Sequence, residues 1–374
     1  MRCTIYMSNL CDIERKVLAG ERLTFADGVQ LFHHPNLPEL GALADYVRRR
    51  KHPAPIVTYN FGRNVNYTNV CWVRCAFCAF YRPPGSGEGY VLSWEEIFRK
   101  VQELVEVGGD QPGSCELLLQ GGLNPQLKIE YFEELFAALK ARFPQVHLHA
   151  LSATEIFYLA RLSRLPLEET IRRLHAAGLD SIPGGGAEIL VEEVRRQISP
   201  RKETPEQWLE VHRIAHQLGL NTTATMMYGS VETLEHRIEH LLRLRALQDE
   251  SLAAGRGQFT AFIPWSFQPR GTALATRRPL KKTRGVDYLR TVAVARLLLD
   301  NIENLQASYV TQGPKIAQIG LKFGLNDFGS TMMEENVVRA AGTNFLLPVE
   351  ELKRLIREAG YEPRRRNTRY ELLE

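Results

Sequence analysis

Three cysteines, Cys71, Cys75 and Cys78, lie within eight positions in the segment NYTNVCWVRCAFCAFYR. Their C-x3-C-x2-C spacing is poor geometry for a disulfide framework and good geometry for binding metal through thiolates. A structural zinc site would need a fourth ligand, and the next cysteine, Cys115, lies near a different predicted strand. The alternative is a four-iron cluster held by three thiolates, which leaves one iron without a protein ligand.

An iron without a protein ligand can chelate the amine and the carboxylate of S-adenosylmethionine. At the low end of cluster potentials, roughly −700 mV, one electron can break the sulfonium bond and yield methionine and a 5′-deoxyadenosyl radical. The cofactor then supplies the radical, and the protein supplies positioning and the exclusion of water. The spacing therefore indicates radical chemistry, with structural zinc and inert buried thiols as the alternatives.

Short β-rich runs alternate with amphipathic helices from PIVTYNF onward, which predicts a parallel sheet with right-handed crossovers. The predicted strands are 56–59, 116–120, 146–151, 179–182, 222–227, 259–264 and 306–310. Their number favours an α/β fold of the closed or nearly closed (β/α) TIM type. In such barrels the loops after the strands carry the chemistry, and the cysteine segment follows the first predicted strand. GGLNP, SATE, PGGGAE and PWSFQPRGT follow later ones.

The chain divides into three predicted parts: a helical leader over residues 1–55, the barrel over 56–330, and a C-terminal helix and tail that close the barrel over 331–374. Ser93 followed by Glu96 is a capping box that opens the first barrel helix. The basic run RRRNTR in the tail is typical of a solvated face.

The composition is that of an ordinary globular protein, with 44% apolar and 24% charged residues. The net charge of +4 is too balanced to predict nucleic acid or a membrane surface as a partner. No secretory signal is visible, and no apolar run approaches the roughly 18 residues needed to cross a bilayer. Free thiols also suit a reducing compartment, so we expect a cytoplasmic protein. The oligomeric state stays open, a homodimer being one option.

The cysteine spacing, with the aromatic Phe77 before the last cysteine, resembles the signature of the radical S-adenosylmethionine superfamily. LLQGGLNPQL, DSIPGGGAEIL and FGLNDFGSTMMEENVVRAAG extend the resemblance nearly end to end, to a branch with the futalosine-route radical enzymes, the deazaflavin-chromophore synthases and methylornithine synthase. NYTNVC, LLQGGLNP and FIPWSFQP are similar to the cyclic dehypoxanthinyl futalosine synthase family in particular. Ser230 stands where that family usually has a histidine, so we assume no essential role for that histidine.

The resemblance implies a [4Fe-4S] cluster and S-adenosylmethionine acting on dehypoxanthine futalosine in menaquinone biosynthesis. A 5′-deoxyadenosyl radical would remove the ribose C4′ hydrogen, and the carbon radical would add to the benzoate ring. Loss of one electron and one proton would give the cyclic product. The implied partner is a low-potential electron donor such as flavodoxin or ferredoxin. Aminofutalosine synthase and deazaflavin-chromophore synthase are the alternatives in the superfamily, and a zinc-stabilised binding protein is the alternative of a different class.

Cofactor contacts are expected from residues in the loops after the strands, namely Phe77, Phe80, Gly121, Gly122, Ser152, Glu188, Arg195 and Lys202. The resemblance implies that the glycine pair meets the methionine amino group and that Phe77 lies against the adenine. Glu188 is a candidate for the ribose hydroxyls, and Arg195 and Lys202 are candidates for the methionine carboxylate. The glycines, Glu188 and the two cations also have ordinary interpretations as turn glycines, a helix-terminal carboxylate and solvated charges, and Phe80 could equally be a core residue.

Glu155 is the predicted base, with helix capping beside Ser152 as its alternative. His147, His149 and His240 are weaker candidates for the base, because most buried histidines are structural. Substrate contacts are predicted from loop and strand-end residues, namely Thr225, Tyr228, Trp265, Gln268, Asn326 and Asp327.

Overall fold

A computed structural model describes residues 10–280, 282–343 and 345–373 of the chain. Its strands are β1 Ile56–Asn66, β2 Cys115–Gln120, β3 Val146–Ala150, β4 Ser181–Ile182, β5 Asn221–Tyr228, β6 Phe259–Ser266, β7 Asn304–Leu305, β8 Asp327–Ser330 and β9 Glu362–Arg365. The first eight are parallel and hydrogen-bonded in the order β7-β6-β5-β4-β3-β2-β1-β8.

The strands close into a ring between β7 and β8. A parallel bridge joins Gln306 to Asp327 just past the end of β7. The Asn326 N–H donates to the Leu305 carbonyl at 3.2 Å, and the Ala307 N–H donates to the Asp327 carbonyl at 2.9 Å. The sheet is therefore a complete barrel, and the predicted (β/α) TIM-type fold is confirmed.

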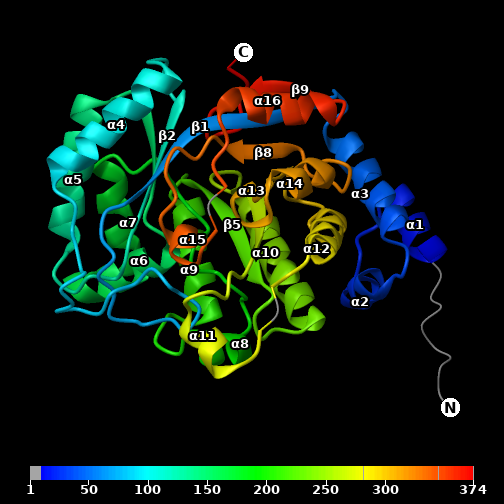
Figure 1. The fold of residues 1–374 in the computed structure, drawn as a ribbon, viewed down its shortest axis with the longest axis horizontal. Coiled ribbons are helices and arrows are strands. Elements are labelled where there is room, and N and C mark those ends of the chain that lie inside the picture. Colours follow the sequence, from blue (N-terminus) through cyan, green and yellow to red (C-terminus); the bar gives the residue numbers. More distant parts are fainter. Residues whose placement is uncertain (1–9, 281, 344, 374) are drawn as a thin grey trace.

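Helices connect successive strands around the outside of the barrel (Figure 1). They are α4 Trp94–Gly108, α5 Ile129–Arg142, α6 Ala153–Ser163, α7 Leu167–Ala176, α8 Glu192–Ile198, α9 Pro205–Gln217, α10 Leu234–Ala254, α11 Ala273–Arg277, α12 Gly285–Leu298, α13 Tyr309–Gln312 and α14 Pro314–Gly320. The capping box of Ser93 and Glu96 is present at α4, and Ser or Thr capping boxes also start α6, α9 and α10. Because each cap satisfies free N–H groups, the sequence determines where these crossovers begin.

The N-terminal helices, α1 Leu10–Ala19, α2 Phe25–His33 and α3 Leu37–Lys51, lie on the flank of the barrel beside α12 (Figure 1). Arg22, just before α2, forms ion pairs of 2.6 Å with Asp249 and 2.7 Å with Asp300. The leader is thus fastened to the barrel wall, away from the loops that follow the strands. In the described part of the chain, no helix combines the length and apolarity needed to cross a membrane.

The C-terminal residues from helix α16, Val349–Glu358, onward close the end of the barrel opposite α8 and α11 (Figure 1). After α15 Val337–Ala340 and α16, strand β9 pairs in parallel with Ile56–Tyr59 of β1. The Arg366 guanidinium then enters the barrel, where it is buried and bonds to the Asp327 carboxylate, with Nη2 to Oδ1 at 2.9 Å. The prediction that RRRNTR is a solvated face is therefore wrong for Arg366, because a buried carboxylate compensates its charge.

Most predicted strands are present, and the errors have local causes. The predicted strand 306–310 is misplaced, because β7 is Asn304–Leu305 with one further bridge at Gln306, and α13 begins at Tyr309. Strands β8 (DFGS) and β9 (EPRR) were not predicted, because neither has the apolar alternation of a half-buried strand. Both depend on pairing with β1, which lies far away in the sequence.

Candidate active site

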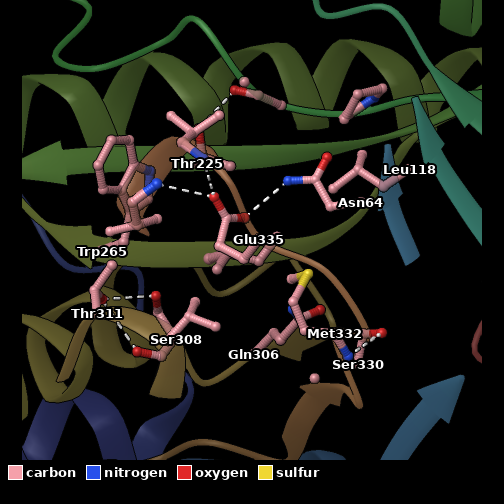
Figure 2. Close-up of a pocket in the computed structure, with 18 of the residues that line it drawn as sticks. Asn64, Leu118, Thr225, Trp265, Gln306, Ser308, Thr311, Ser330, Met332 and Glu335 are labelled. Carbon is pink, nitrogen blue, oxygen red and sulfur yellow. Dashed lines mark hydrogen bonds between the residues drawn. The ribbon is translucent and has the colours of Figure 1, made fainter. Parts of the chain in front are cut away.

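A cavity of about 300 Å³ occupies the inside of the barrel (Figure 2). Phe77 and Cys78 line it at the end of the barrel where the strands finish, and Arg366 and Tyr370 of the C-terminal tail line the closed end. Alternate residues of each long strand face it, because successive side chains point to opposite sides. The strand residues that line it include Asn60, Asn64, Glu116, Leu118, Gln120, Thr223, Thr225, Met227, Ile263 and Trp265. The barrel thus encloses space for a ligand.

The cysteine loop, residues 67–92 between β1 and α4, covers the open end of this cavity. The Cys71 N–H donates to the Arg82 carbonyl at 2.8 Å, which folds the loop back on itself. The Ala76 N–H donates to the Ile198 carbonyl at 2.8 Å, and the Leu274 N–H donates to the Ala76 carbonyl at 2.7 Å. These bonds attach the loop to the end of α8 on one side and to α11 on the other.

The three thiols of the cysteine loop share one small volume. Burial raises the pKa of Cys75 well above its usual range, although the nearby Lys202 ammonium acts in the opposite direction. Burial also raises the pKa of Cys78, and Cys71 lies close enough to raise both further. A thiol in such a site ionises readily only when a metal supplies positive charge, because metal ligation stabilises the thiolate.

Within the described residues, no fourth cysteine reaches the loop. Cys115 starts β2 at the closed end of the barrel, with its Sγ 3.4 Å from the Gly109 carbonyl oxygen, and Cys11 is exposed on α1. Cys3 lies outside the described residues. In the same part of the chain, no three histidine, cysteine, aspartate or glutamate side chains form a cage for one metal ion. An iron–sulfur cluster does not need three ligands around one ion, because each thiolate binds a different iron. Three soft thiols at a cavity mouth fit such a group.

Gly121 and Gly122 allow the cysteine loop to lie directly on the end of β2. A Cβ at Gly121 would stand 2.8 Å from the Tyr67 ring, and a Cβ at Gly122 would overlap the Val70 carbonyl oxygen. The Gly121 N–H is already used, because it donates to Glu155 at 2.9 Å. A cofactor could therefore meet the carbonyl of Gly121 but not its N–H.

Ser152 and Glu155 form the capping box of α6, and neither lines the large cavity. The Glu155 carboxylate accepts from the Ser152 N–H (2.7 Å), the Ser152 hydroxyl (2.6 Å), the Gly121 N–H (2.9 Å) and the Tyr67 hydroxyl (2.8 Å). Burial raises the pKa of Glu155, against these bonds, which lower it. Four donors occupy its four acceptor positions. The structure places the predicted base in a capping and loop-fastening role.

Glu188, Arg195 and Lys202 are brought together in a buried cluster of charges next to the cysteine loop. Lys202 Nζ lies 2.8 Å from the Glu188 carboxylate, and Arg195 lies 3.4 Å from Glu188 and 2.8 Å from Glu203. Arg195 also donates to the carbonyls of Gly186 (3.0 Å) and Glu203 (2.8 Å). Glu188 has a φ of 41°, a left-handed conformation that few non-glycine residues adopt. Arg195 is therefore committed to the protein, whereas Lys202 is also near Cys75.

The two predicted aromatic contacts differ in position. Phe77 lines the cavity, and its ring centroid is 5.9 Å from Lys202 Nζ. Phe80 does not line the cavity and packs edge-on against Tyr90, with ring centroids 6.5 Å apart. The geometry thus favours Phe77 as the cofactor contact and gives Phe80 a packing role.

Three of the six predicted substrate residues, Thr225, Trp265 and Gln268, line the cavity. Gln268 is also anchored, since it accepts from the Thr343 hydroxyl at 2.9 Å. Tyr228 does not line the cavity, because it lies an odd number of positions from Thr225 on β5 and so points to the opposite face. Its ring packs outside the lumen under the Arg237 guanidinium, 4.5 Å from the ring centroid.

Asn326 and Asp327, also predicted to contact substrate, are buried structural residues outside the cavity lining. The Asn326 side chain accepts from Arg296 at 2.7 Å and donates to Asn304 at 2.8 Å, next to the β7–β8 junction. Asp327 bonds to Arg366 and accepts from the Gly329 N–H at 2.9 Å. These two predictions are corrected: LNDFGS starts β8 at the closed end of the barrel.

Several polar residues that line the cavity were not predicted, among them Asn64, Gln120, Gln306 and Glu335. Asn64 and Gln120 belong to the inward-facing positions of β1 and β2, so their spacing of two along a strand could have identified them. Glu335 belongs to the quoted segment STMMEEN, but its sequence neighbour Glu334 has the same side chain. Only the fold distinguishes these two glutamates.

Of the three candidate histidines, His149 alone lines the cavity. Its Nδ1 is 2.6 Å from the Ser181 hydroxyl, which is also 2.7 Å from His147 Nε2. His240 is buried outside the lining and accepts from the Leu190 N–H at 3.0 Å. Burial lowers the pKa of His147 to about 4 and that of His240 to about 3.

Comparison with known proteins agrees with this site. The radical SAM superfamily model matches residues 65–244, and the CofH/MqnC C-terminal region model matches residues 256–374. Methylornithine synthase superposes with a TM-score of 0.70 at 18% identity, covering 94% of this chain and 97% of its own, which supports the fold.

Two curated relatives match nearly the whole chain. The cyclic dehypoxanthine futalosine synthase of Halalkalibacterium halodurans is 47% identical over 96% of this chain and 94% of its own. The aminodeoxyfutalosine synthase of Thermus thermophilus is 43% identical over 96% of this chain and 95% of its own. The chain therefore belongs to the radical S-adenosylmethionine superfamily, in the family that includes the cyclic dehypoxanthine futalosine synthases and the aminodeoxyfutalosine synthases.

Proposed function

We propose that this chain cyclises dehypoxanthine futalosine to cyclic dehypoxanthine futalosine by radical chemistry, a step of the futalosine route to menaquinone. The observation that carries the proposal is the 47% identity to a cyclic dehypoxanthine futalosine synthase over 96% of the chain. The two family models match residues 65–244 and 256–374, which together span the cysteine loop and most of the cavity wall. Aminodeoxyfutalosine synthesis is the second candidate, because a relative with that activity is 43% identical.

Cys71, Cys75 and Cys78 would hold a [4Fe-4S] cluster with one iron open to S-adenosylmethionine, and the two groups together would supply a 5′-deoxyadenosyl radical. The backbone carbonyls of Gly121 and Gly122, at the end of β2, are the groups we assign to the methionine amino group. The cysteine loop also excludes water from the cavity mouth, which protects a reactive carbon radical from side reactions.

The remaining cofactor contacts divide into binding and positioning residues. We assign the adenine to the Phe77 ring, the ribose hydroxyls to Glu188, and the methionine carboxylate to Lys202, which lies near Cys75. Arg195 is a positioning residue, because its guanidinium holds the carbonyls of Gly186 and Glu203. Removal of Arg195 should therefore displace Glu188 rather than remove a direct cofactor contact.

The cavity walls match the two halves of the proposed substrate. Asn64, Gln120 and Thr225 offer amide and hydroxyl groups for the sugar hydroxyls, while Trp265 and Phe267 offer apolar surface for the benzoate ring. Binding both halves in one enclosed space holds the ribose carbon near the ring it must attack. Such positioning replaces an encounter between free groups and can contribute several orders of magnitude in rate.

A basic surface around the cysteine loop suits an acidic electron donor such as flavodoxin or ferredoxin. Residues 71–82, 195–202 and 268–285 contain no aspartate or glutamate, and the backbone bonds of Ala76 join the three segments. Arg74, Arg201, Arg277 and Arg278 are exposed on these segments. We infer that charge complementarity guides the donor to the loop. A reducing cytoplasm would supply such a carrier and keep the thiols free.

Anaerobic reconstitution with iron, sulfide and S-adenosylmethionine tests the function. The expected result is a brown protein that releases free 5′-deoxyadenosine and a cyclic product two hydrogens poorer than dehypoxanthine futalosine. An adenosylated product from an enolpyruvyl benzoate would instead assign aminodeoxyfutalosine synthesis. A colourless protein with one zinc ion and no turnover would refute the radical assignment.

The donor surface has its own test, which compares flavodoxin with dithionite as reductant. Reduction by flavodoxin should slow steeply as ionic strength rises, because salt screens exposed charges. Arg277→Glu with Arg278→Glu should slow reduction by flavodoxin and leave reduction by dithionite unchanged. If flavodoxin reduces wild type and the double variant at equal rates, this docking surface is refuted.

A further inference from the structure

Glu335 places a carboxylate inside the cavity, near its open end. Figure 2 shows it among Asn64, Thr225 and Trp265, all of which line the same space. Its segment lies at the mouth, because a Cβ on Gly271 would be 3.6 Å from the Ala340 carbonyl oxygen and 3.7 Å from the Ala79 Cβ of the cysteine loop. Glu335 thus lies at the end of the cavity where the radical would arise.

The hydrogen bonds of Glu335 leave one acceptor position open. Oε1 accepts from the N–H groups of Val337 (2.7 Å) and Val338 (2.9 Å), and Oε2 accepts from the Asn64 amide at 2.8 Å. A carboxylate has about four acceptor positions, so one on Oε2 has no donor among the described residues. Glu155, in contrast, accepts four hydrogen bonds and lies outside the cavity.

No cationic side chain among the described residues forms an ion pair with Glu335. Its neighbour Glu334 differs, because it points out of the cavity into ion pairs of 2.6 Å with Lys100 and 3.0 Å with Arg63. Burial raises the pKa of Glu335, and the negative charge of Glu334 adds to this, against three hydrogen bonds that lower it. A carboxylate with a raised pKa and no cationic partner holds a transferred proton better than a paired one.

We propose that Glu335 is the catalytic base that removes the ring proton after cyclisation. This inference rests on the proposed function. When the ribose carbon radical bonds to the benzoate ring, the attacked ring carbon keeps its hydrogen and the ring holds an unpaired electron. Glu335 takes that hydrogen as a proton, and the unpaired electron passes to a one-electron acceptor of the iron–sulfur or flavin class. The ring thereby regains aromaticity, and the proton and electron that leave account for the oxidation.

The other ionisable groups that face the cavity are less suited to this role. They are Cys78, Glu116, His149, Tyr309, Arg366 and Tyr370. Glu116, the other carboxylate, lies deeper, since β2 pairs it with His147 and Gly62, whereas Leu118 pairs with Asn64. It therefore faces the closed end, near Arg366. His149 is a poor acceptor, because burial lowers its pKa.

The test compares Glu335→Gln with Glu334→Gln, a matched change one residue away that faces out of the cavity. Both are assayed as reconstituted enzymes with dithionite, and 5′-deoxyadenosine and cyclic product are quantified in the same samples. In wild type the two should form in nearly equal amounts. Glu335→Gln should still form 5′-deoxyadenosine, while cyclic product falls about 100-fold or more, the usual contribution of a general base. Dithionite should then convert the stalled ring radical to a cyclised isomer with the mass of the substrate. Glu334→Gln should keep the wild-type ratio.

Two measurements separate base catalysis from a structural role. Calorimetry on the reconstituted proteins without reductant should show substrate affinity within about 3-fold of wild type for Glu335→Gln. The wild-type ratio of product to 5′-deoxyadenosine should fall as pH is lowered, because a protonated Glu335 cannot accept a proton, and the Glu335→Gln ratio should not change with pH. Glu335→Asp keeps an ionisable carboxyl and should restore part of the product with its own pH dependence.

The proposal is overturned if Glu335→Gln keeps the wild-type ratio, whether or not its substrate affinity changes. It is also overturned if Glu335→Asp forms product independently of pH. Failure of the proposed function would look different, because wild type itself would then form no cyclic product.

Discussion

The ion pair between Arg366 and Asp327 is expected to be a main source of stability at the closed end of the barrel. Arg366 is 2% exposed and Asp327 is fully buried, and their two bonds join the C-terminal tail to β8. Arg366→Met keeps a side chain of similar length but leaves the Asp327 carboxylate buried without its cation. Such a loss typically costs about 3–5 kcal/mol, because a buried charge has lost the water and the partner that stabilised it.

Urea denaturation of the cluster-free protein measures this cost. Arg364→Met is the control, because Arg364 is 40% exposed in its ion pair with Glu362 and should lose no more than about 1 kcal/mol. The double variant Asp327→Asn with Arg366→Met removes both charges and should recover at least half of the loss. If Arg366→Met is as stable as wild type but binds substrate weakly, Arg366 serves the substrate carboxylate, and the structural role is refuted.

Three further outcomes are expected. Gly122→Ala should prevent cluster loading, measured by iron content and visible absorption, because its Cβ would overlap the Val70 carbonyl of the cysteine loop. Gly87→Ala, within the cysteine loop, is the control and should load normally, because its Cβ would meet nothing within 4 Å. Cys115→Ala should keep the cluster, measured in the same way, because its thiol lies at the far end of β2. The free energy of unfolding should fall below about pH 6.5, by up to about 2 kcal/mol at pH 5 from His240 alone. The unfolded chain takes up this proton near its ordinary pKa, whereas burial lowers the pKa of His240 to about 3, and urea titrations of wild type and His240→Gln test this.

The sequence predicted the parts of the fold that short-range signals define. Apolar runs located β1 to β6, and the capping box of Ser93 and Glu96 located the start of α4, because both signals lie within a few residues of the element they specify. Strands β8 and β9 were not predicted, since DFGS and EPRR lack apolar alternation and form strands only by pairing with a distant β1. The role of Arg366 also depends on a distant part of the chain, because its partner Asp327 is 39 residues away.

A site residue could be predicted where its position after a strand identifies it. It could not be predicted where its role depends on the direction in which its side chain points. Glu188 and Lys202 could be predicted because both lie between the fourth and fifth strands, and the structure brings them together beside the cysteine loop. Tyr228 was predicted to contact substrate but points out of the cavity, because neighbouring residues of one strand face opposite sides. A carboxylate in the loop after a strand is a reasonable base, which predicts Glu155 and gives no reason to select Glu335. Sequence does not reveal that four donors already occupy Glu155.

The cavity joins two parts of the chain that the family models also separate. The cysteine loop, the glycine pair and the buried charge cluster all lie within residues 65–244. We assign all three to the cofactors and none to the substrate. Trp265, Gln268, Glu335 and Arg366 lie within residues 256–374 and line the remaining wall, from the mouth to the closed end. Asn64, Gln120 and Thr225 precede residue 256 and line the same cavity. A radical that arises at the mouth is therefore directed by side chains of both parts, and we expect the choice between cyclisation and adenosyl transfer to depend on cavity-lining residues of both.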